Sequence, residues 1–351
     1  MKKLIPPLAA VLVIAAGAAV YVYSERLMQP RSGETPQAPT SVAGTSEGTR
    51  ADGNAPAPKP GETAMFWRDP TGGDNEVWRL RGSSAPERHP VQKLDAGWKA
   101  LVFAPGGWGG DDLLVWRNDT SGQLRIWRLA RDGGMAAFEI LPYSGAEWRI
   151  VAASDMDGDG DADLGWIGPN GSVAVWTLQD GKPGRKETVG TARAGWQLIQ
   201  VANFDEDGSA EMLWRDPASG QMVLWDMNGA DKAVERNLPG VPVEWTLIGA
   251  GQLDGADAED LLWRNDSGTL AIWRGLAAAN ALLIGRTEVP DWAYVGLADV
   301  DTDGRADVLW RHRNDGSMGA WSIAEDGRVS DIGLPLPPRS AELVPTGYVA
   351  P

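Results

Sequence analysis

Tryptophan recurs along this chain at a nearly fixed interval, and this recurrence constrains the fold more than any other feature. Three series of tryptophans repeat every 47 to 50 residues. They are Trp98, Trp148, Trp196, Trp245 and Trp292; Trp67, Trp116, Trp166, Trp214, Trp263 and Trp310; and Trp78, Trp127, Trp176, Trp225, Trp273 and Trp321. Of the 18 tryptophans, Trp108 alone lies outside these series. A period of this length indicates one supersecondary unit that is repeated side by side.

The pattern inside one repeat indicates β-strands. The repeat from Glu244 reads EWTLIGAGQLDGADAEDLLWRNDSGTLAIWRGLAAANALLIGRTEVP and contains four short apolar runs, which are Trp245–Gly249, Leu261–Arg264, Leu270–Arg274 and Leu282–Val289. Gly, Asp, Asn and Ser separate the runs and are typical of turns. The runs are too short for typical helices. Four antiparallel strands in a unit of nearly fifty residues predict the blade of a β-propeller.

Counting the strands predicts the number of blades. The second strand, marked by a tryptophan that is followed by arginine in every repeat except that of Trp166, occurs six times, and the first strand occurs five times. The first repeat starts at a second strand, AMFWRD, and the C-terminal stretch AELVPTGYVA resembles the missing first strand, with Leu343 in the place of the tryptophan. We therefore expect an all-β fold, a six-bladed β-propeller of four-stranded antiparallel blades. Its ring closes by pairing of the C-terminal and N-terminal strands in one blade.

Three repeats carry oxygen-bearing side chains at alternate positions between their first and second strands. Positions 1, 3, 5, 7 and 9 are Asp155, Asp157, Asp159, Asp161 and Asp163 in the third repeat, Asn203, Asp205, Asp207, Ser209 and Glu211 in the fourth, and Asp299, Asp301, Asp303, Arg305 and Asp307 in the sixth. Position 6 is glycine in all three, which allows a sharp turn. Calcium prefers six to eight oxygen ligands, so this spacing predicts about three calcium sites.

These loops differ from an EF-hand, which needs a bidentate Glu at position 12 between two helices. Here position 12 is a tryptophan inside a strand. Position 7 is expected to contribute its backbone carbonyl, so Arg305 is compatible with a site. Polar turns without metal are the alternative interpretation, and magnesium fits less well because it retains more water. In the fifth repeat position 5 is Ala256, and the second repeat has no carboxylate before Asp111, so we predict no calcium in either.

With these loops and the L-W-R-[N/D] segments after them, as in DVLWRHRNDGSMGAWSI, the chain resembles the FG-GAP and VCBS-type repeats of integrin-α-like propellers. The resemblance covers roughly residues 63–349 and is most specific in the three acidic loops. It implies calcium-supported propellers that serve in adhesion or ligand binding, often outside the cell. The chain departs from integrin-type heads in having six repeats rather than seven, and in having loops without ligands.

Adjacent tryptophan and arginine side chains are the candidate ligand-binding residues. Sugar rings stack on exposed indoles, and some propellers with this repeat resemble lectins with pockets between blades. The candidates are Trp116 with Arg117, Trp214 with Arg215, Trp263 with Arg264, Trp310 with Arg311, and Trp108 in the segment GGWGG. The alternative interpretation is that the recurring tryptophans pack blade against blade, because a packing role must recur in every blade. Trp108 lies outside the repeat, which makes it a candidate contact residue at a blade edge.

The N-terminal segments differ from the repeats. Lys2 and Lys3 precede an apolar run from Leu4 to Tyr23, which is long enough to cross a bilayer as a helix. We expect residues 1–28 to be a signal anchor or a cleaved signal peptide, and residues 29–62 to be a disordered linker to the propeller of residues 63–351. Both alternatives place the propeller in the cell envelope, either anchored to the inner membrane on its periplasmic side or secreted after cleavage. Only the N-terminal helix is expected to contact the membrane.

Charge and composition limit the function further. The formal net charge of -16 opposes binding to nucleic acid, whose phosphates need a basic surface. With two histidines, no cysteine and no G-x-S-x-G motif, the sequence predicts that the chain is not an enzyme. The leading hypothesis is a non-catalytic, calcium-stabilised binding or adhesion module that mediates protein interaction. A carbohydrate-binding lectin is the alternative, and a hydrolase is the third candidate because paired carboxylates also hydrolyse glycosides.

Overall fold

The computed structural model describes residues 62–81, 85–95, 97–141, 147–228, 231–255, 258–277, 281–286, 291–334 and 341–344. The predicted signal anchor and residues 29–61 of the predicted linker lie outside this part of the chain. Within the part that is described, no helix is both long enough and apolar enough to span a membrane.

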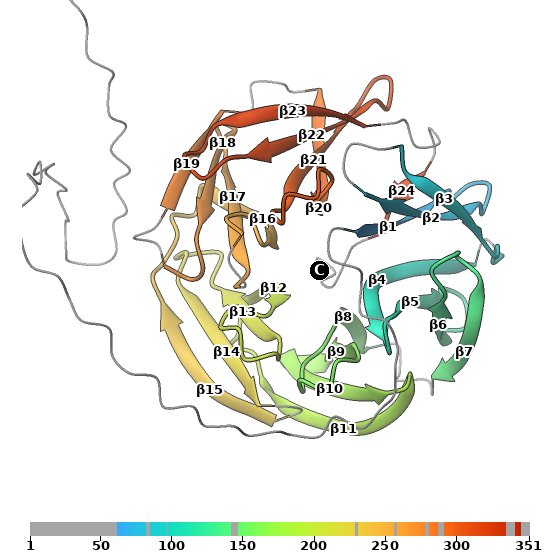
Figure 1. The fold of residues 1–351 in the computed structure, drawn as a ribbon. Helices are drawn as coiled ribbons and strands as arrows, with labels where there is room; N and C mark the ends of the chain where they lie inside the picture. The colour runs from blue at the N-terminus through green and yellow to red at the C-terminus, as the bar shows by residue number, and fades with distance from the viewer. Residues whose placement is uncertain are drawn as a thin grey trace, which may run out of the picture. The chain divides into compact units, whose positions relative to one another are not determined.

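The described residues form six four-stranded antiparallel sheets, which follow one another around a ring as the blades of a propeller (Figure 1). Blade 1 consists of β1 (Thr63–Arg68), β2 (Asn75–Leu80), β3 (Glu87–Val91) and β24 (Glu342–Leu343). Blade 2 consists of β4 (Trp98–Trp108), β5 (Asp111–Asn118), β6 (Leu124–Leu129) and β7 (Met135–Leu141). Blade 3 consists of β8 (Arg149–Ser154), β9 (Asp163–Ile167), β10 (Ser172–Gln179) and β11 (Lys182–Thr191), with the short 3-10 helix η1 (Pro169–Gly171) before β10.

The remaining three blades repeat this plan. Blade 4 consists of β12 (Gln197–Ala202), β13 (Glu211–Arg215), β14 (Met222–Asn228) and β15 (Asp231–Leu238). Blade 5 consists of β16 (Trp245–Gly251), β17 (Asp260–Asn265), β18 (Thr269–Trp273) and β19 (Ala281–Arg286). Blade 6 consists of β20 (Trp292–Ala298), β21 (Asp307–His312), β22 (Met318–Ile323) and β23 (Val329–Leu334).

The order of the strands runs from the centre of the ring to its rim. The first strands β8, β12, β16 and β20 lie towards the centre in Figure 1, and each contacts the first strand of the adjacent blade. The second and third strands follow outward, and the fourth strand forms the outer edge. The predicted all-β, six-bladed architecture is therefore confirmed.

Pairing of β24 with β1 closes the ring, as expected, but the predicted alignment of Leu343 is wrong by two residues. Leu343 pairs with Trp67, the second-strand tryptophan of blade 1. In blade 2 the residue in that place is Ala100, which pairs with Trp116 and lies two positions after the first-strand tryptophan. Ala341 therefore occupies the tryptophan position, and blade 1 has no first-strand tryptophan.

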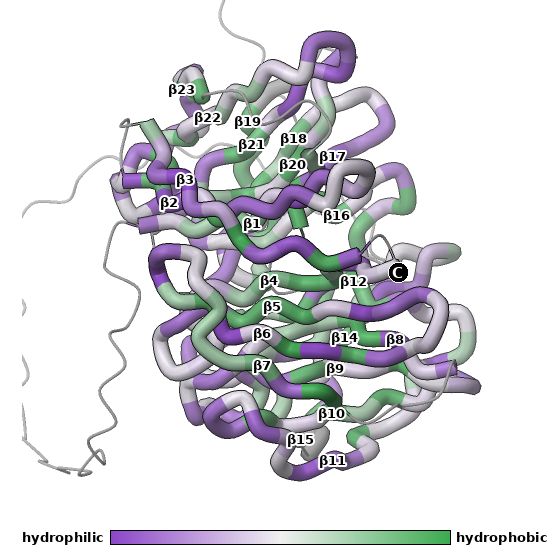
Figure 2. The backbone as a smooth tube through the Cα atoms, turned by 90° about the vertical axis from the view of Figure 1, so that its right-hand side faces the viewer, coloured by the Kyte–Doolittle hydropathy of each residue, from purple (hydrophilic) through white to green (hydrophobic). Residues whose placement is uncertain are grey.

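The second strands are buried on both faces because each blade packs between two neighbours. All five residues of β13 are buried, whereas β11 at the rim is largely exposed. Burial on both faces explains why the second strands are continuous apolar runs rather than alternating ones. Figure 2 shows the hydrophobic segments along inner strands such as β4 and β5, and hydrophilic segments at many of the turns.

Inside every blade the second-strand tryptophan contacts the third-strand tryptophan. The ring centroids lie 4.5 to 5.6 Å apart in the pairs Trp67–Trp78, Trp116–Trp127, Trp166–Trp176, Trp214–Trp225, Trp263–Trp273 and Trp310–Trp321. An aromatic pair at this distance contributes about 0.5–1.5 kcal/mol beyond the apolar area that it buries. Tryptophan therefore recurs at a fixed interval in the sequence because the same packing contact recurs in every blade.

Candidate metal centres at the blade loops

Each acidic loop connects the first strand of its blade to the second, so the three loops lie at the same end of the ring. The ninth-position acid begins the second strand and accepts a hydrogen bond from the backbone N–H of position 2. The pairs are Met156 with Asp163 at 2.9 Å, Phe204 with Glu211 at 2.7 Å, Leu253 with Asp260 at 3.1 Å and Val300 with Asp307 at 2.9 Å. Blade 5 keeps this bond without the full set of acids, so the ninth-position acid also shapes the loop by itself.

The three predicted loops each bring carboxylates together. In each group, every member offers one oxygen that lies within 4.8 Å of those of the other members. The groups are Asp155, Asp157 and Asp163 in blade 3, Asp205, Asp207, Glu211 and Asp226 in blade 4, and Asp299, Asp301 and Asp303 in blade 6. Several carboxylates that converge from one tight turn make the oxygen-rich environment that calcium prefers.

The other predicted ligands are engaged with neighbouring groups. Asp161 accepts hydrogen bonds from the backbone of Gly109 at 2.7 Å and of Asp180 at 2.6 Å. Its carboxylate thus accepts two backbone hydrogen bonds, and the contribution of a backbone carbonyl from position 7 stays a prediction. Three further side-chain bonds lie within the loops and join Asp159 with Asp161 N, Asn203 with Glu206 N, and Ser209 with Asp207. Ser209 Oγ also lies 3.5 Å from the carbonyl of Met227 on β14.

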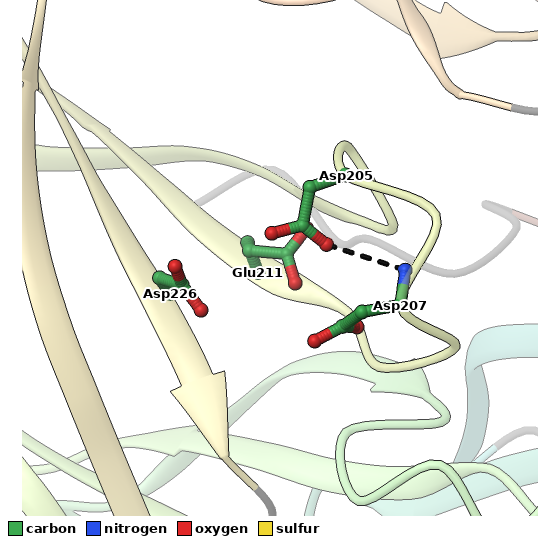
Figure 3. Close-up of side chains that lie close together, drawn as sticks. All are labelled: Asp205, Asp207, Glu211 and Asp226. Atoms are coloured by element: carbon green, nitrogen blue, oxygen red, sulfur yellow. Dashed lines mark hydrogen bonds between the residues drawn. The ribbon is translucent and has the colours of Figure 1, made fainter.

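Asp226 is the acidic residue that the sequence analysis missed. It lies on β14, the third strand of blade 4, next to Trp225, which pairs with Met212 of β13. This register places Asp226 across from Glu211 and beside the loop (Figure 3). The spacing inside the loop holds no signal for it, because the residue joins the group only through the pairing of two strands.

Glu211 is the most buried acid of the blade 4 group. It is 0% exposed, and its Oε1 accepts no hydrogen bond from the described residues, while its Oε2 accepts one from Phe204 N. Burial raises the pKa of Glu211 to about 8, and the repulsion of Asp205 and Asp207 acts in the same direction. A buried oxygen without a donor, surrounded by like charge, is costly unless a cation compensates it.

The site in blade 6 differs in its charge. The guanidinium of Arg305 at position 7 donates to Asp303 Oδ2, from Nη2 at 2.6 Å and from Nε at 3.1 Å. One of the three grouped carboxylates is therefore already paired with a protein cation. This pairing competes with a metal for Asp303, which makes blade 6 a weaker candidate than blade 4.

Backbone hydrogen bonds link each loop to the loop before it. Ala210 N, at position 8 in blade 4, donates to the carbonyl of Asp155, at position 1 in blade 3, at 2.7 Å. The same bond joins Ala306 N in blade 6 to the carbonyl of Gln252 in blade 5 at 2.7 Å. One loop therefore supplies a backbone acceptor to the next.

Trp108 is buried, which differs from its predicted place at a blade edge. It is 3% exposed and ends β4, where Gly109 and Gly110 form a tight turn with positive φ values in place of an acidic loop. The indole covers Gly181, and a Cβ there would lie 1.8 Å from Trp108 Cζ2. The segment GGWGG is thus a packing element between blades 2 and 3.

The other candidate tryptophans are also buried, and their indole faces are covered by protein. Trp116, Trp214, Trp263 and Trp310 are 0 to 3% exposed. These tryptophans are therefore packing residues, as the alternative interpretation held.

The adjacent arginines reach the following blade. Arg215 donates to the carbonyl of Trp245 in blade 5 at 2.6 Å, and its guanidinium lies 5.5 Å from the ring centre of Trp263. Arg311 makes the same kind of bond to Ala341, whereas Arg117 and Arg264 are half-buried. Arg215 and Arg311 therefore fasten neighbouring blades.

Comparison with known proteins gives distant structural similarities alone. No protein-family model matches the chain, and no curated protein sequence matches it. A solved structure of AofleA from Arthrobotrys oligospora is 15% identical and has a TM-score of 0.43, with 83% of this chain and 90% of that chain covered. The periplasmic gluconolactonase PpgL of Pseudomonas aeruginosa is 13% identical with a TM-score of 0.42, over 80% and 99% of the two chains. The WD40 domain of Toxoplasma gondii coronin is 13% identical with a TM-score of 0.38, over 78% and 68%.

The prediction that the chain is not an enzyme is contradicted. PpgL is an enzyme, and a putative 6-phosphogluconolactonase from Bacteroides fragilis, 12% identical with a TM-score of 0.42, is also similar to this chain. The exclusion of catalysis that was based on the residue composition is therefore withdrawn.

Proposed function

We propose that this chain is a calcium-stabilised protein-binding module of the cell envelope, related to the FG-GAP and VCBS-type repeat propellers. The buried Glu211 oxygen, without a hydrogen-bond donor and beside three further carboxylates, is the observation that carries the calcium assignment. The ion in blade 4 would be held by Asp205, Asp207, Glu211 and Asp226. Two further ions would be held by Asp155, Asp157 and Asp163 in blade 3 and by Asp299, Asp301 and Asp303 in blade 6.

Calcium would supply positive charge beside the grouped carboxylates, and in blade 6 it would add to the charge of Arg305. Like charges that converge in a partly buried turn repel one another, and a divalent cation converts this repulsion into attraction. Because the loops are joined through bonds such as that from Ala210 to Asp155, the stabilisation would extend between blades.

Binding to a protein surface is supported by the shape of the depressions on the described residues. The depression beside His312 and Arg313 has a volume of about 250 Å³, and the one beside Glu62 and Asp112 about 20 Å³. Small-molecule sites usually have volumes of about 300–1,000 Å³. Depressions of this size suit a partner that covers a broad area rather than a small molecule. The envelope location rests on the apolar run from Leu4 to Tyr23.

Thermal melting with and without calcium tests this proposal. Three occupied sites at about 100 times their Kd add about 8 kcal/mol, which corresponds to a rise in Tm of more than about 10 °C for a domain of this size. The triple variant Asp157→Ala, Asp205→Ala, Asp301→Ala is expected to lose this rise. A control triple variant of exposed acids outside the loops, Asp119→Ala, Asp326→Ala, Asp331→Ala, is expected to keep it. If the loop variant still gains the full rise, the assignment of the sites is wrong.

A further inference from the structure

One position on the third strand varies between blades in step with the acidic loops. This position directly follows the third-strand tryptophan. It pairs with the residue three places before the second-strand tryptophan, as in Ala64–Arg79 and Leu113–Arg128, and that residue is the ninth position in the acidic loops. From blade 1 to blade 6 its occupants are Arg79, Arg128, Thr177, Asp226, Arg274 and Ser322. Arginine occurs in blades 1, 2 and 5, whose described residues include no cluster of converging carboxylates like those of the three acidic loops. Hydroxyl or acidic residues occur in blades 3, 4 and 6, which have one.

Each of the three arginines pairs with a carboxylate of its own blade, which lies before the second strand in blades 1 and 5 and is the first residue of that strand in blade 2. The ion pairs are Arg79 with Glu62 at 3.9 Å, Arg128 with Asp111 at 2.7 Å, and Arg274 with Asp254 at 3.9 Å. Arg79 also forms a buried ion pair with Asp112 of the next blade. A guanidinium stays charged at every physiological pH, so it is a permanent cation beside these acids.

The blades with acidic loops have no such cation at this position. Thr177 is buried, and its Oγ1 accepts a hydrogen bond from Arg185 N at 2.9 Å. Ser322 is neutral and lies across from Asp307, whose buried Oδ1 accepts no hydrogen bond from the described residues. In blade 4 the position adds a further negative charge, because Asp226 points towards Glu211, whose Oε1 is buried and accepts no hydrogen bond from the described residues (Figure 3).

We propose that this cross-strand residue decides, blade by blade, how the negative charge of the loop is neutralised. Where it is arginine, the protein supplies its own cation and the loop takes no metal. Where it is a hydroxyl residue, the loop takes a divalent cation, and Asp226 makes the blade 4 site the tightest of the three. This inference rests on the proposed function, because it needs calcium as the cation in blades 3, 4 and 6.

An arginine at this position and a metal ion in the loop exclude each other because both are positively charged. A guanidinium at this position would lie within a few ångströms of a metal in the loop, and like charges this close repel one another by several kcal/mol at an effective dielectric constant near 20. Asp226 has the opposite effect, since each added carboxylate raises the affinity of an oxygen site for calcium.

Replacement of Ser322 by arginine tests the first part. Calorimetric titration of the full chain with calcium chloride is expected to count three sites in the wild type and two in Ser322→Arg, while Tm in chelator stays at or above the wild-type value. Ser121→Arg adds the same charge at an exposed hairpin at the other end of the strands, and this control keeps three sites. Three sites of unchanged affinity in Ser322→Arg would overturn the inference.

Replacement of Asp226 by serine tests the second part and does not depend on fitting a larger side chain. Asp226→Ser converts the blade 4 position to that of blade 6 and is expected to weaken the tightest site by about tenfold or more while three sites remain. Asp119→Ser, at an exposed turn, is the matched control and leaves all affinities unchanged. An unchanged tightest site in Asp226→Ser would overturn the role of this residue.

The two proposals fail in different ways. A wild-type chain that takes up no calcium overturns the proposed function and this inference together. A wild-type chain that takes up three ions, with variants that behave as the wild type, overturns only the inference.

Discussion

Arg215 offers a direct test of whether the W-R arginines fasten the blades or bind a ligand. Its guanidinium is 9% exposed and donates to three carbonyl groups, those of Trp245 at 2.6 Å, Val241 at 3.0 Å and Pro242 at 2.9 Å. In Arg215→Met the aliphatic part keeps its packing, but the three carbonyls lose their charged donor. Each hydrogen bond that water does not replace contributes about 1–2 kcal/mol. Loss of the three bonds therefore lowers the free energy of unfolding by about 4 kcal/mol.

This loss is large enough to measure by urea or thermal unfolding followed by tryptophan fluorescence. For a domain of this size about 1 kcal/mol shifts Tm by about 2 °C, so Arg215→Met is expected to melt about 8 °C below the wild type. Arg185→Met is the control, because the Arg185 side chain is exposed and its guanidinium pairs with Glu187 at the surface. The control is expected to stay within about 1 °C. If Arg215→Met melted with the wild type but lost binding to glycans, the role in fastening blades would be refuted and the lectin hypothesis favoured.

Two further predictions concern the charge of the loops and the packing of blade 2. Burial raises the pKa of Glu211 to about 8 and of Asp163 to about 7, above their unfolded values near 4, so the metal-free folded protein holds protons that the unfolded chain has released. Its stability is therefore expected to fall by about 2 kcal/mol or more as pH rises from 5 to 9, and a Tm in chelator that rises over this range would contradict the argument. Gly181→Ala, whose Cβ would lie 1.8 Å from Trp108 Cζ2, is expected to lose about 3 kcal/mol or more in urea unfolding. Gly195→Ala, with a similar φ of +82° and no atom within 4 Å, is expected to lose only about 1 kcal/mol; equal losses would exclude the clash as the cause.

The architecture was predictable because one side chain marks equivalent strands. Trp116 and Trp127 stand in the same relation in every blade, so the interval between them and their repeats locates the second and third strands directly. The loops were predictable for a similar reason, since their acids are local in sequence. Both signals come from residues that contact one another within a single repeat.

What the sequence did not reveal depends on register or on a neighbouring blade. Asp226 joins its group because β14 pairs with β13, and a shift of one residue would place it on the other face. Trp108 is buried because Gly181 of the following blade leaves room for the indole. Leu343 was misaligned because β24 has only two residues, too few for a pattern.

The contacts at the seam of the ring explain why alanine is sufficient at the closing strand. At an ordinary junction, a position-8 group of one loop binds the position-1 carbonyl of the previous loop, and at the other end of the blades Arg215 binds the carbonyl of Trp245. At the seam, Thr63 Oγ1 binds the carbonyl of Asp299 at 2.8 Å, and Arg311 binds the carbonyl of Ala341. The ordinary junction and the seam thus both use backbone carbonyls as acceptors, and a residue of any type supplies a backbone carbonyl. The tryptophan of the first strand is a packing residue, and the fastening of blade to blade does not require it.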